Sequence, residues 1–129
     1  MRGKVISTKD APGAIGPYSQ AVQANGFLFI SGQVGLDPAT GSLVSGGVVE
    51  QTERAITNLE AILAAAGCGL EDVVKTTVLL DTMDDFQTVN EVYGRRFGEN
   101  RPARAAFAVQ TLPLGSLVEI EAVAAMPQG

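Results

Sequence analysis

The chain has 129 residues, of which 46% are hydrophobic and 18% charged, and its formal net charge is −5. This length is typical of one domain, and an acidic chain repels the phosphate backbone of nucleic acids. The sequence has no histidine and a single cysteine, which excludes histidine-based catalytic triads, histidine metal sites and an internal disulfide. We therefore expect a single domain over residues 1–129 that binds neither nucleic acid nor a metal ion.

The sequence does not predict a membrane segment. No apolar run approaches the roughly 18 residues that a helix needs to span a bilayer. Residues 1–10, MRGKVISTKD, lack the apolar core of a signal peptide. We expect a cytoplasmic protein. Its high apolar fraction indicates that part of the surface is buried against other copies.

Three short strands are expected before the first helix. Lys4–Thr8 predicts one of them, and Ala21–Gly32 predicts two more, joined by Asn25–Gly26 because both residues of this turn tolerate a positive φ. Ala11–Gln20 contains two prolines and two glycines and is expected to form a shaped loop. Gly35–Gly47 is rich in turn residues and is expected at the surface.

Two helices are expected after these strands. From Val48 to Ala66 the apolar residues recur at helical spacing, and Gly67 is suited to end the helix. Residues 83–97, MDDFQTVNEVYGRRF, predict a second helix with a cap near Asp84 or Asp85. Its apolar stripe consists of Phe86, Val89, Tyr93 and Phe97.

Three further strands complete the predicted fold. They are expected at Asp72–Leu80, Arg104–Thr111 and Leu117–Ala125. The order is then β-ββ-α-β-α-ββ, an α+β sheet. Each helix has a single apolar stripe, so both are expected to cover the same face of the sheet.

The last strand indicates what lies on the opposite face. Val118, Ile120 and Ala122 share one side of it, whereas Glu119 and Glu121 share the other. If the apolar set packs under the helices, the two carboxylates stand on the uncovered face. We expect the paired strands to bring Arg104 and Glu119 onto this same face, which would make it a subunit interface that contains a site.

Arg104 is an unusual residue for its surroundings. It lies in RPARAAFAV, residues 101–109, which otherwise predicts a buried strand. A guanidinium group is costly among apolar neighbours unless an anionic group meets it. The partner could be Glu119 or Glu121 of the same chain, or it could be a ligand. The residues alone leave both alternatives open.

Cys68 is expected to be a structural thiol. It follows Gly67 in AAAGCGL, and no histidine or second cysteine is present to activate it.

Six sequence blocks follow one another between Lys4 and Met126. They are APGAIGPYSQAV, SGQVGLDPATG, NLEAILAAAG, VVKTTVLLDTMDDFQTVNEVY, RPAR and VEIEAVA. In this order they resemble the RidA (YjgF-type) reactive-intermediate deaminases. The resemblance implies a chorismate-mutase-like fold, assembled as a homotrimer with the sheets facing inward. It also implies ligand pockets in the clefts between subunits and no organic or metal cofactor.

The resemblance implies an enzyme, a 2-iminobutanoate/2-iminopropanoate deaminase. Its substrates would be reactive 2-enamine and 2-imine acids, such as 2-aminoacrylate and its imine, released by pyridoxal-phosphate enzymes. Hydrolysis gives 2-keto acids and ammonia. The sequence does not indicate which imine is preferred, and it identifies no protein partner.

Site residues follow from the matched positions. Arg104 matches the arginine that grips the substrate carboxylate, and a planar fork can do so through two parallel bonds. Ser31 matches a serine that binds the same carboxylate, and Gly32 beside it lets the backbone approach closely. The backbone carbonyl of Ala106 matches the acceptor for the substrate nitrogen. The serine common before that position is Ala105 here, which removes a possible hydrogen bond.

The remaining matched residues concern the attacking water and the neighbouring subunit. Tyr18 and Glu119 match the pair that positions the water, and burial would raise the pKa of Glu119 into a useful range. Glu121 does not match and is treated as structural. The resemblance implies that Asn90 contributes from the neighbouring subunit, although a helix-surface amide is an alternative.

Two other functions stay open at this point. The first is a non-catalytic module that binds or senses small carboxylates on the same trimeric scaffold. The second is a role in acting on nucleic acids or as a chaperone, against which the acidic composition and the absence of histidine argue.

Overall fold

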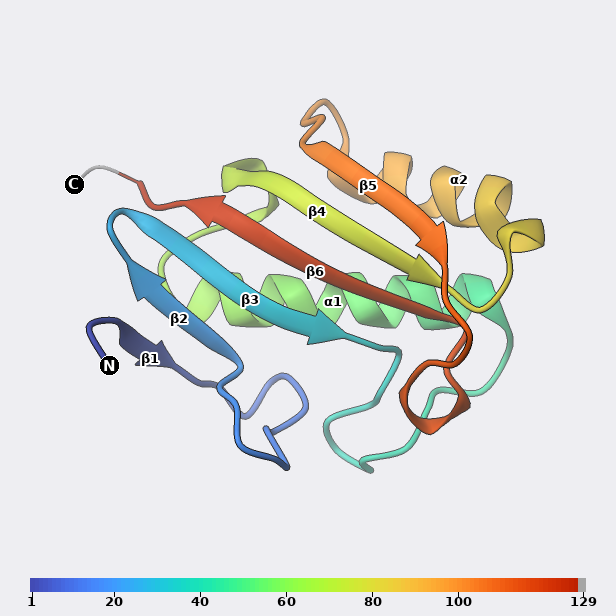
Figure 1. Cartoon of the computed structure of the whole chain (residues 1–129), viewed down its shortest axis with the longest axis horizontal. Coiled ribbons are helices and arrows are strands. Elements are labelled where there is room, and N and C mark those ends of the chain that lie inside the picture. Colours follow the sequence, from blue (N-terminus) through green and yellow to red (C-terminus); the bar gives the residue numbers. More distant parts are fainter. Residues whose placement is uncertain (128–129) are drawn as a thin grey trace.

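In the computed structural model, which describes residues 1–127, six strands form one mixed sheet and two helices pack on it (Figure 1). The strands are β1 (Lys4–Ile6), β2 (Ala21–Ala24), β3 (Phe27–Gln33), β4 (Val73–Leu80), β5 (Ala103–Ala108) and β6 (Val118–Ala125). The helices are α1 (Val48–Ala65) and α2 (Phe86–Phe97). This order confirms the predicted one. The predicted domain, 1–129, extends two residues beyond those described.

The sheet order is β1-β2-β3-β6-β4-β5, with β5 and β1 at the two edges. Only β4 and β5 pair in parallel, and every other pairing is antiparallel. Figure 1 shows both helices behind the sheet, so the prediction that they cover one face is confirmed. No helix formed by residues 1–127 is long and apolar enough to cross a membrane.

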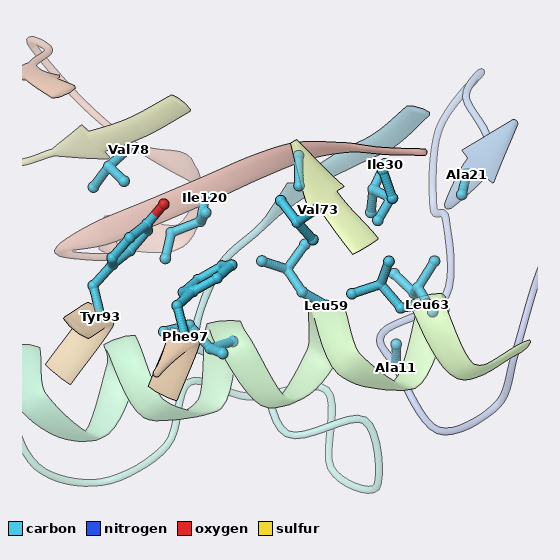
Figure 2. Packing of buried hydrophobic residues seen from close by; sticks show 14 of the residues in the cluster. Ala11, Ala21, Ile30, Leu59, Leu63, Val73, Val78, Tyr93, Phe97 and Ile120 are labelled. Atoms are coloured by element: carbon cyan, nitrogen blue, oxygen red, sulfur yellow. The ribbon is translucent and has the colours of Figure 1, made fainter. Parts of the chain in front are cut away.

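The core lies between this face and the helices. Leu59 of α1 lies beside Val73 of β4, while Tyr93 and Phe97 of α2 lie beside Ile120 of β6 (Figure 2). Burying one such aliphatic side chain contributes about 1.5–3 kcal/mol. The alternation predicted for β6 is confirmed. Val118, Ile120, Ala122 and Ala124 are at most 3% exposed, whereas Glu119 and Glu121 face away.

The end of α1 follows the prediction made from Gly67. This glycine has a φ of 80°, a left-handed value that glycine adopts without strain. The Cys68 amide donates to the Leu63 carbonyl at 2.8 Å and the Gly67 amide donates to the Ala64 carbonyl at 3.0 Å. These two bonds form a Schellman motif, which satisfies the last carbonyls of the helix.

The start of α2 differs from the prediction. Thr82, rather than Asp84 or Asp85, provides the cap, because its Oγ1 accepts a hydrogen bond from the Asp84 amide at 3.1 Å. A 3-10 turn over Met83–Asp85 precedes the α-helix and moves the cap back along the chain. The Asp85 side chain makes no capping bond.

The prediction of a buried strand around Arg104 was also wrong. β5 ends at Ala108 and lies at the edge of the sheet, and none of its residues is buried. Arg104 itself is exposed. The alanines that indicated burial are short side chains on an edge strand, and no element lies beyond this strand in the described part of the chain.

Gln20 fixes the loop between β1 and β2. Its side chain is buried, with 4% exposed. Its Oε1 accepts from the Thr8 amide at 2.7 Å, and its Nε2 donates to the carbonyls of Thr8 at 3.1 Å and Pro12 at 2.8 Å. Such bonds replace the backbone partners that a loop lacks. They hold the segment that carries Tyr18, two residues before Gln20.

Cys68 is half-buried, and its Sγ lies 3.5 Å from the Sδ of Met126. Burial raises the pKa of the Cys68 thiol, and the negative charges of Asp72 and Glu71 raise it further. The thiol therefore stays protonated at neutral pH, in keeping with a structural role.

Candidate functional site

Arg104 lies on the helix side of the sheet edge. It pairs with Thr76 of β4, a buried residue, so its side chain extends toward α2. Nη1 of Arg104 donates to Oδ1 of Asn90 at 2.7 Å. The guanidinium carbon lies 5.0 Å from the ring centre of Tyr93 and 5.6 Å from that of Phe86. Both distances are in the range of a cation–π interaction.

The charge of Arg104 has no carboxylate partner among residues 1–127. The ion pairs there join Arg95 to Glu53, and Arg96 to Glu53 and Glu60, on the outer surface of the two helices. The alternative of a structural salt bridge from Arg104 to Glu119 or Glu121 of the same chain is therefore wrong. Asn90 occupies one donor, which leaves donors of the guanidinium for a carboxylate from outside.

Glu119 is half-buried on the opposite face, above Gly32 of β3. A Cβ atom added at Gly32 would lie only 2.8 Å from Cδ of Glu119 and would overlap its carboxylate. The absence of a side chain at Gly32 thus makes the room that the carboxylate occupies. Burial raises the pKa of Glu119, and the negative charge of Glu121 raises it further.

Arg104 and Glu119 do not share a face, so the prediction that they do was wrong. Glu119 pairs with Leu79 of β4, and Leu79 pairs with Phe107 of β5. Phe107 is three residues from Arg104, an odd separation that places the two side chains on opposite sides of the strand. Within the chain, the sheet separates the guanidinium of Arg104 from the carboxylate of Glu119.

Tyr18 and Ser31 border an open hollow of about 730 Å³ on the outer face of the sheet. Lys75 and Glu121 also line it. Tyr18 is 54% exposed, and the Ser31 hydroxyl donates to the Ser19 carbonyl at 2.6 Å. The serine hydroxyl is therefore already used as a donor, whereas the tyrosine hydroxyl is accessible.

Ala106 presents its backbone at the open edge of the sheet. The Val109 amide donates to the Leu80 carbonyl at 2.9 Å, so the odd-numbered residues of β5 direct their polar groups toward β4. Backbone groups alternate along a strand, and those of Ala106 therefore point outward. This places the Ala106 carbonyl on the edge that carries Arg104.

The site residues indicated by the sequence thus fall into two groups. The edge group consists of Arg104, Asn90 and Ala106, and the face group consists of Tyr18, Ser31, Gly32 and Glu119. Within one chain, contacts join Arg104 to Asn90 and Gly32 to Glu119, and Tyr18 and Ser31 share the hollow, but the two groups do not meet. Among residues 1–127, no three or more His, Cys, Asp or Glu side chains gather where a metal ion could be held.

The aromatic support of the edge group was not predicted as part of the site. Phe86 and Tyr93 were assigned only to the apolar stripe of α2. A signal was available, because Phe86, Asn90 and Tyr93 are spaced i, i+4, i+7 and lie on one helix face.

Comparison with known proteins gives one consistent result. The family model described as endoribonuclease L-PSP matches residues 8–126. The 2-iminobutanoate/2-iminopropanoate deaminase of Mus musculus is 63% identical, over 94% of this chain and 90% of that protein.

Two solved structures are also similar to this chain. That of a Thermotoga maritima protein has a TM-score of 0.93 and 53% identity and covers 98% of each chain. That of Escherichia coli TdcF with bound serine has a TM-score of 0.91 and 40% identity, covering 96% of this chain and 99% of TdcF. The sequence blocks, the sheet order and these matches agree, and the chain belongs to the RidA/YjgF/L-PSP family.

Proposed function

We propose that this chain hydrolyses 2-imino and 2-enamino acids, such as 2-iminopropanoate and 2-aminoacrylate, to 2-keto acids and ammonia. One observation carries the proposal: the Arg104 guanidinium is held by Asn90 above two aromatic rings, with no carboxylate to neutralise it among the described residues. The carboxylate of a small organic acid can bind to the free donors of this guanidinium. The deaminase relative and the serine bound to TdcF support a substrate of this size and class.

The complete site requires two subunits. The edge group and the face group lie on opposite sides of the sheet, so the edge group of one copy meets the face group of another in a cyclic homotrimer. Two features support such an assembly. The outer face exposes large apolar side chains, Phe27, Phe29 and Phe107, and β5 leaves an unpaired edge.

The residues have separate tasks in this site. Arg104 binds the substrate carboxylate through its free donors, and Ser31 adds a bond when its hydroxyl turns from the Ser19 carbonyl. The Ala106 carbonyl accepts the imine N–H. Asn90 accepts a hydrogen bond from Arg104 of its own chain, so we place the two residues on the same subunit of the site, whereas the resemblance implied that Asn90 comes from the neighbouring one. Fixing the carboxylate and the nitrogen places the imine carbon where water can attack it.

Glu119 and Tyr18 act on the water. The Glu119 carboxylate takes a proton from the water while the water oxygen forms a bond to the imine carbon. The Tyr18 hydroxyl orients the water. The proton passes to the nitrogen and gives a carbinolamine. The hydroxyl proton of the carbinolamine is then transferred through Glu119 to the nitrogen as the C–N bond breaks, and the products are ammonia and a 2-keto acid.

The rival is a module that binds small carboxylates without turning them over. Steady-state ammonia release from freshly generated 2-iminopropanoate separates the two. We expect release well above the spontaneous hydrolysis measured without protein, and continuing over many turnovers. Saturable binding with no release above that background would support the binding module instead.

The shared site has its own test. The variants Arg104→Ala and Glu119→Gln are each expected to be strongly impaired but still measurable, because each lacks one group. Co-expression in equal amounts is expected to restore roughly a quarter of wild-type activity, since a mixed trimer has one intact site among three. A site built within one subunit would show no restoration. The matched control co-expresses two variants of the same group, Arg104→Ala and Asn90→Ala, and should restore nothing.

A further inference from the structure

The aromatic ring of Tyr93, beneath Arg104, is held at two points. Tyr93 is 6% exposed, and its hydroxyl lies 2.7 Å from Oγ1 of Thr76, a bond buried in the sheet. Phe97 stacks against its ring at a centroid distance of 4.4 Å. Figure 2 shows the Tyr93 hydroxyl turned toward the sheet, with Phe97 beside the ring. The ring is therefore held through both its hydroxyl and its stacking partner.

Tyr93 provides an uncharged surface for the guanidinium. Burial raises the pKa of the Tyr93 phenol, an effect that the Thr76 hydrogen bond and the charges of Arg104 and Arg101 partly offset. The phenol stays neutral at physiological pH, so its ring attracts Arg104 through the π face and does not neutralise it. The interaction also leaves the N–H groups at the rim of the guanidinium unused.

Asn90 fixes the remaining freedom of the side chain. A guanidinium resting on a ring can still turn in the plane of the ring, and the bond from Nη1 to the Asn90 carbonyl oxygen sets that rotation. Arg104 is otherwise an exposed side chain on an edge strand, with several rotatable bonds. Ordering such a side chain at the moment of binding would reduce the affinity for substrate.

We propose that Tyr93, anchored by Thr76, is a positioning residue that holds Arg104 in its carboxylate-binding orientation before substrate arrives. This inference rests on the proposed function, in which Arg104 binds the substrate carboxylate. Tyr93 does not touch the substrate, and its contribution passes through Arg104. Loss of the ring therefore weakens substrate binding more than it slows the chemical step.

Three single variants test the inference. Tyr93→Leu is expected to raise KM for 2-iminopropanoate about tenfold, with kcat changed less than threefold, because it removes the π surface. Tyr93→Phe keeps the ring and is expected to retain a KM within about threefold of wild type. Phe97→Leu is the matched control: it removes the stacked neighbour, which makes no cation–π contact with Arg104. It should lower the unfolding temperature and leave KM within about twofold of wild type.

A double-mutant cycle with Arg104→Ala separates positioning from general loosening of the core. If Tyr93 acts through Arg104, then Tyr93→Leu has no further effect on kcat/KM in the Arg104→Ala background. If the tenfold loss persists in that background, or Phe97→Leu raises KM as much as Tyr93→Leu, the positioning role is wrong while the proposed function stands. If Arg104→Ala itself has wild-type kcat/KM, the proposed function fails first, and with it this inference. Should Tyr93→Leu not fold, Tyr93→Met is used in its place.

Discussion

Replacing Arg104 by lysine is expected to lower kcat/KM for 2-iminopropanoate about a hundredfold. Lysine keeps the positive charge but loses the planar fork that binds a carboxylate through two parallel bonds. Loss of one charge-assisted hydrogen bond costs about 1.5–3 kcal/mol, which is roughly ten- to a hundredfold in binding, and the misplaced substrate reacts more slowly as well. Steady-state kinetics of ammonia release, over a panel of amino-acid-derived imines, measures the effect.

Arg95→Lys is the matched control for this variant. Arg95 lies on the outer surface of α2 and pairs with Glu53 at 2.6 Å, so the same substitution removes a guanidinium from a surface ion pair. Such pairs contribute little, and kcat/KM should stay within about twofold of wild type. Wild-type rates for Arg104→Lys across the panel would remove the bidentate contact from the mechanism.

Replacing Glu119 by glutamine is expected to lower kcat about a hundred- to ten-thousandfold, the usual contribution of a positioned general base. The amide fills the same space above Gly32 but cannot take a proton from water. At neutral pH the variant should be as stable as wild type or more stable. The pKa of Glu119 is raised in the folded protein, so its ionised form is held at a cost that falls as pH decreases through that pKa. A large loss of kcat would confirm that Glu119 acts as the base, and an unchanged or higher unfolding temperature would confirm that its charge is destabilising.

The dependence of kcat/KM on pH tests whether Glu119 is the base. The base must be ionised, so kcat/KM is expected to fall as pH decreases through the raised pKa of Glu119, at a higher pH than for an ordinary glutamate. Burial is the larger cause of the shift, and the negative charge of Glu121 is the smaller one. Glu121→Gln should therefore move the acid limb to lower pH while retaining activity. A limb that does not move, or moves to higher pH, would contradict the assignment of Glu119 as the base.

Patterns confined to one element predicted the fold well. The alternation in β6 separated Ile120 from Glu119 correctly, because a strand has a fixed period of two. Gly67 marked the end of α1 because the Schellman motif needs a left-handed residue there. The stripe on α2 identified Val89, Tyr93 and Phe97 as buried for the same kind of local reason.

Relations between elements could not be predicted in this way. Whether Arg104 and Glu119 lie on the same face of the sheet depends on two strand registers, that of β6 with β4 and that of β4 with β5. A shift of one residue in either register would move one of the two side chains to the other face. The sequence alone does not indicate that β4 lies between β5 and β6. The support of Arg104 by Tyr93 depends likewise on where α2 lies against the sheet edge, which neither sequence segment specifies alone.

The environment of Cys68 has a practical consequence. Because its pKa is raised and it is partly buried beside Met126, Cys68 is expected to react more slowly with maleimides and disulfides than an exposed cysteine does. A cysteine introduced at Thr40, on the exposed loop between β3 and α1, would then be modified selectively. A fluorophore at this position could test for the proposed trimer, through exchange of chains between labelled copies, without removal of the native residue.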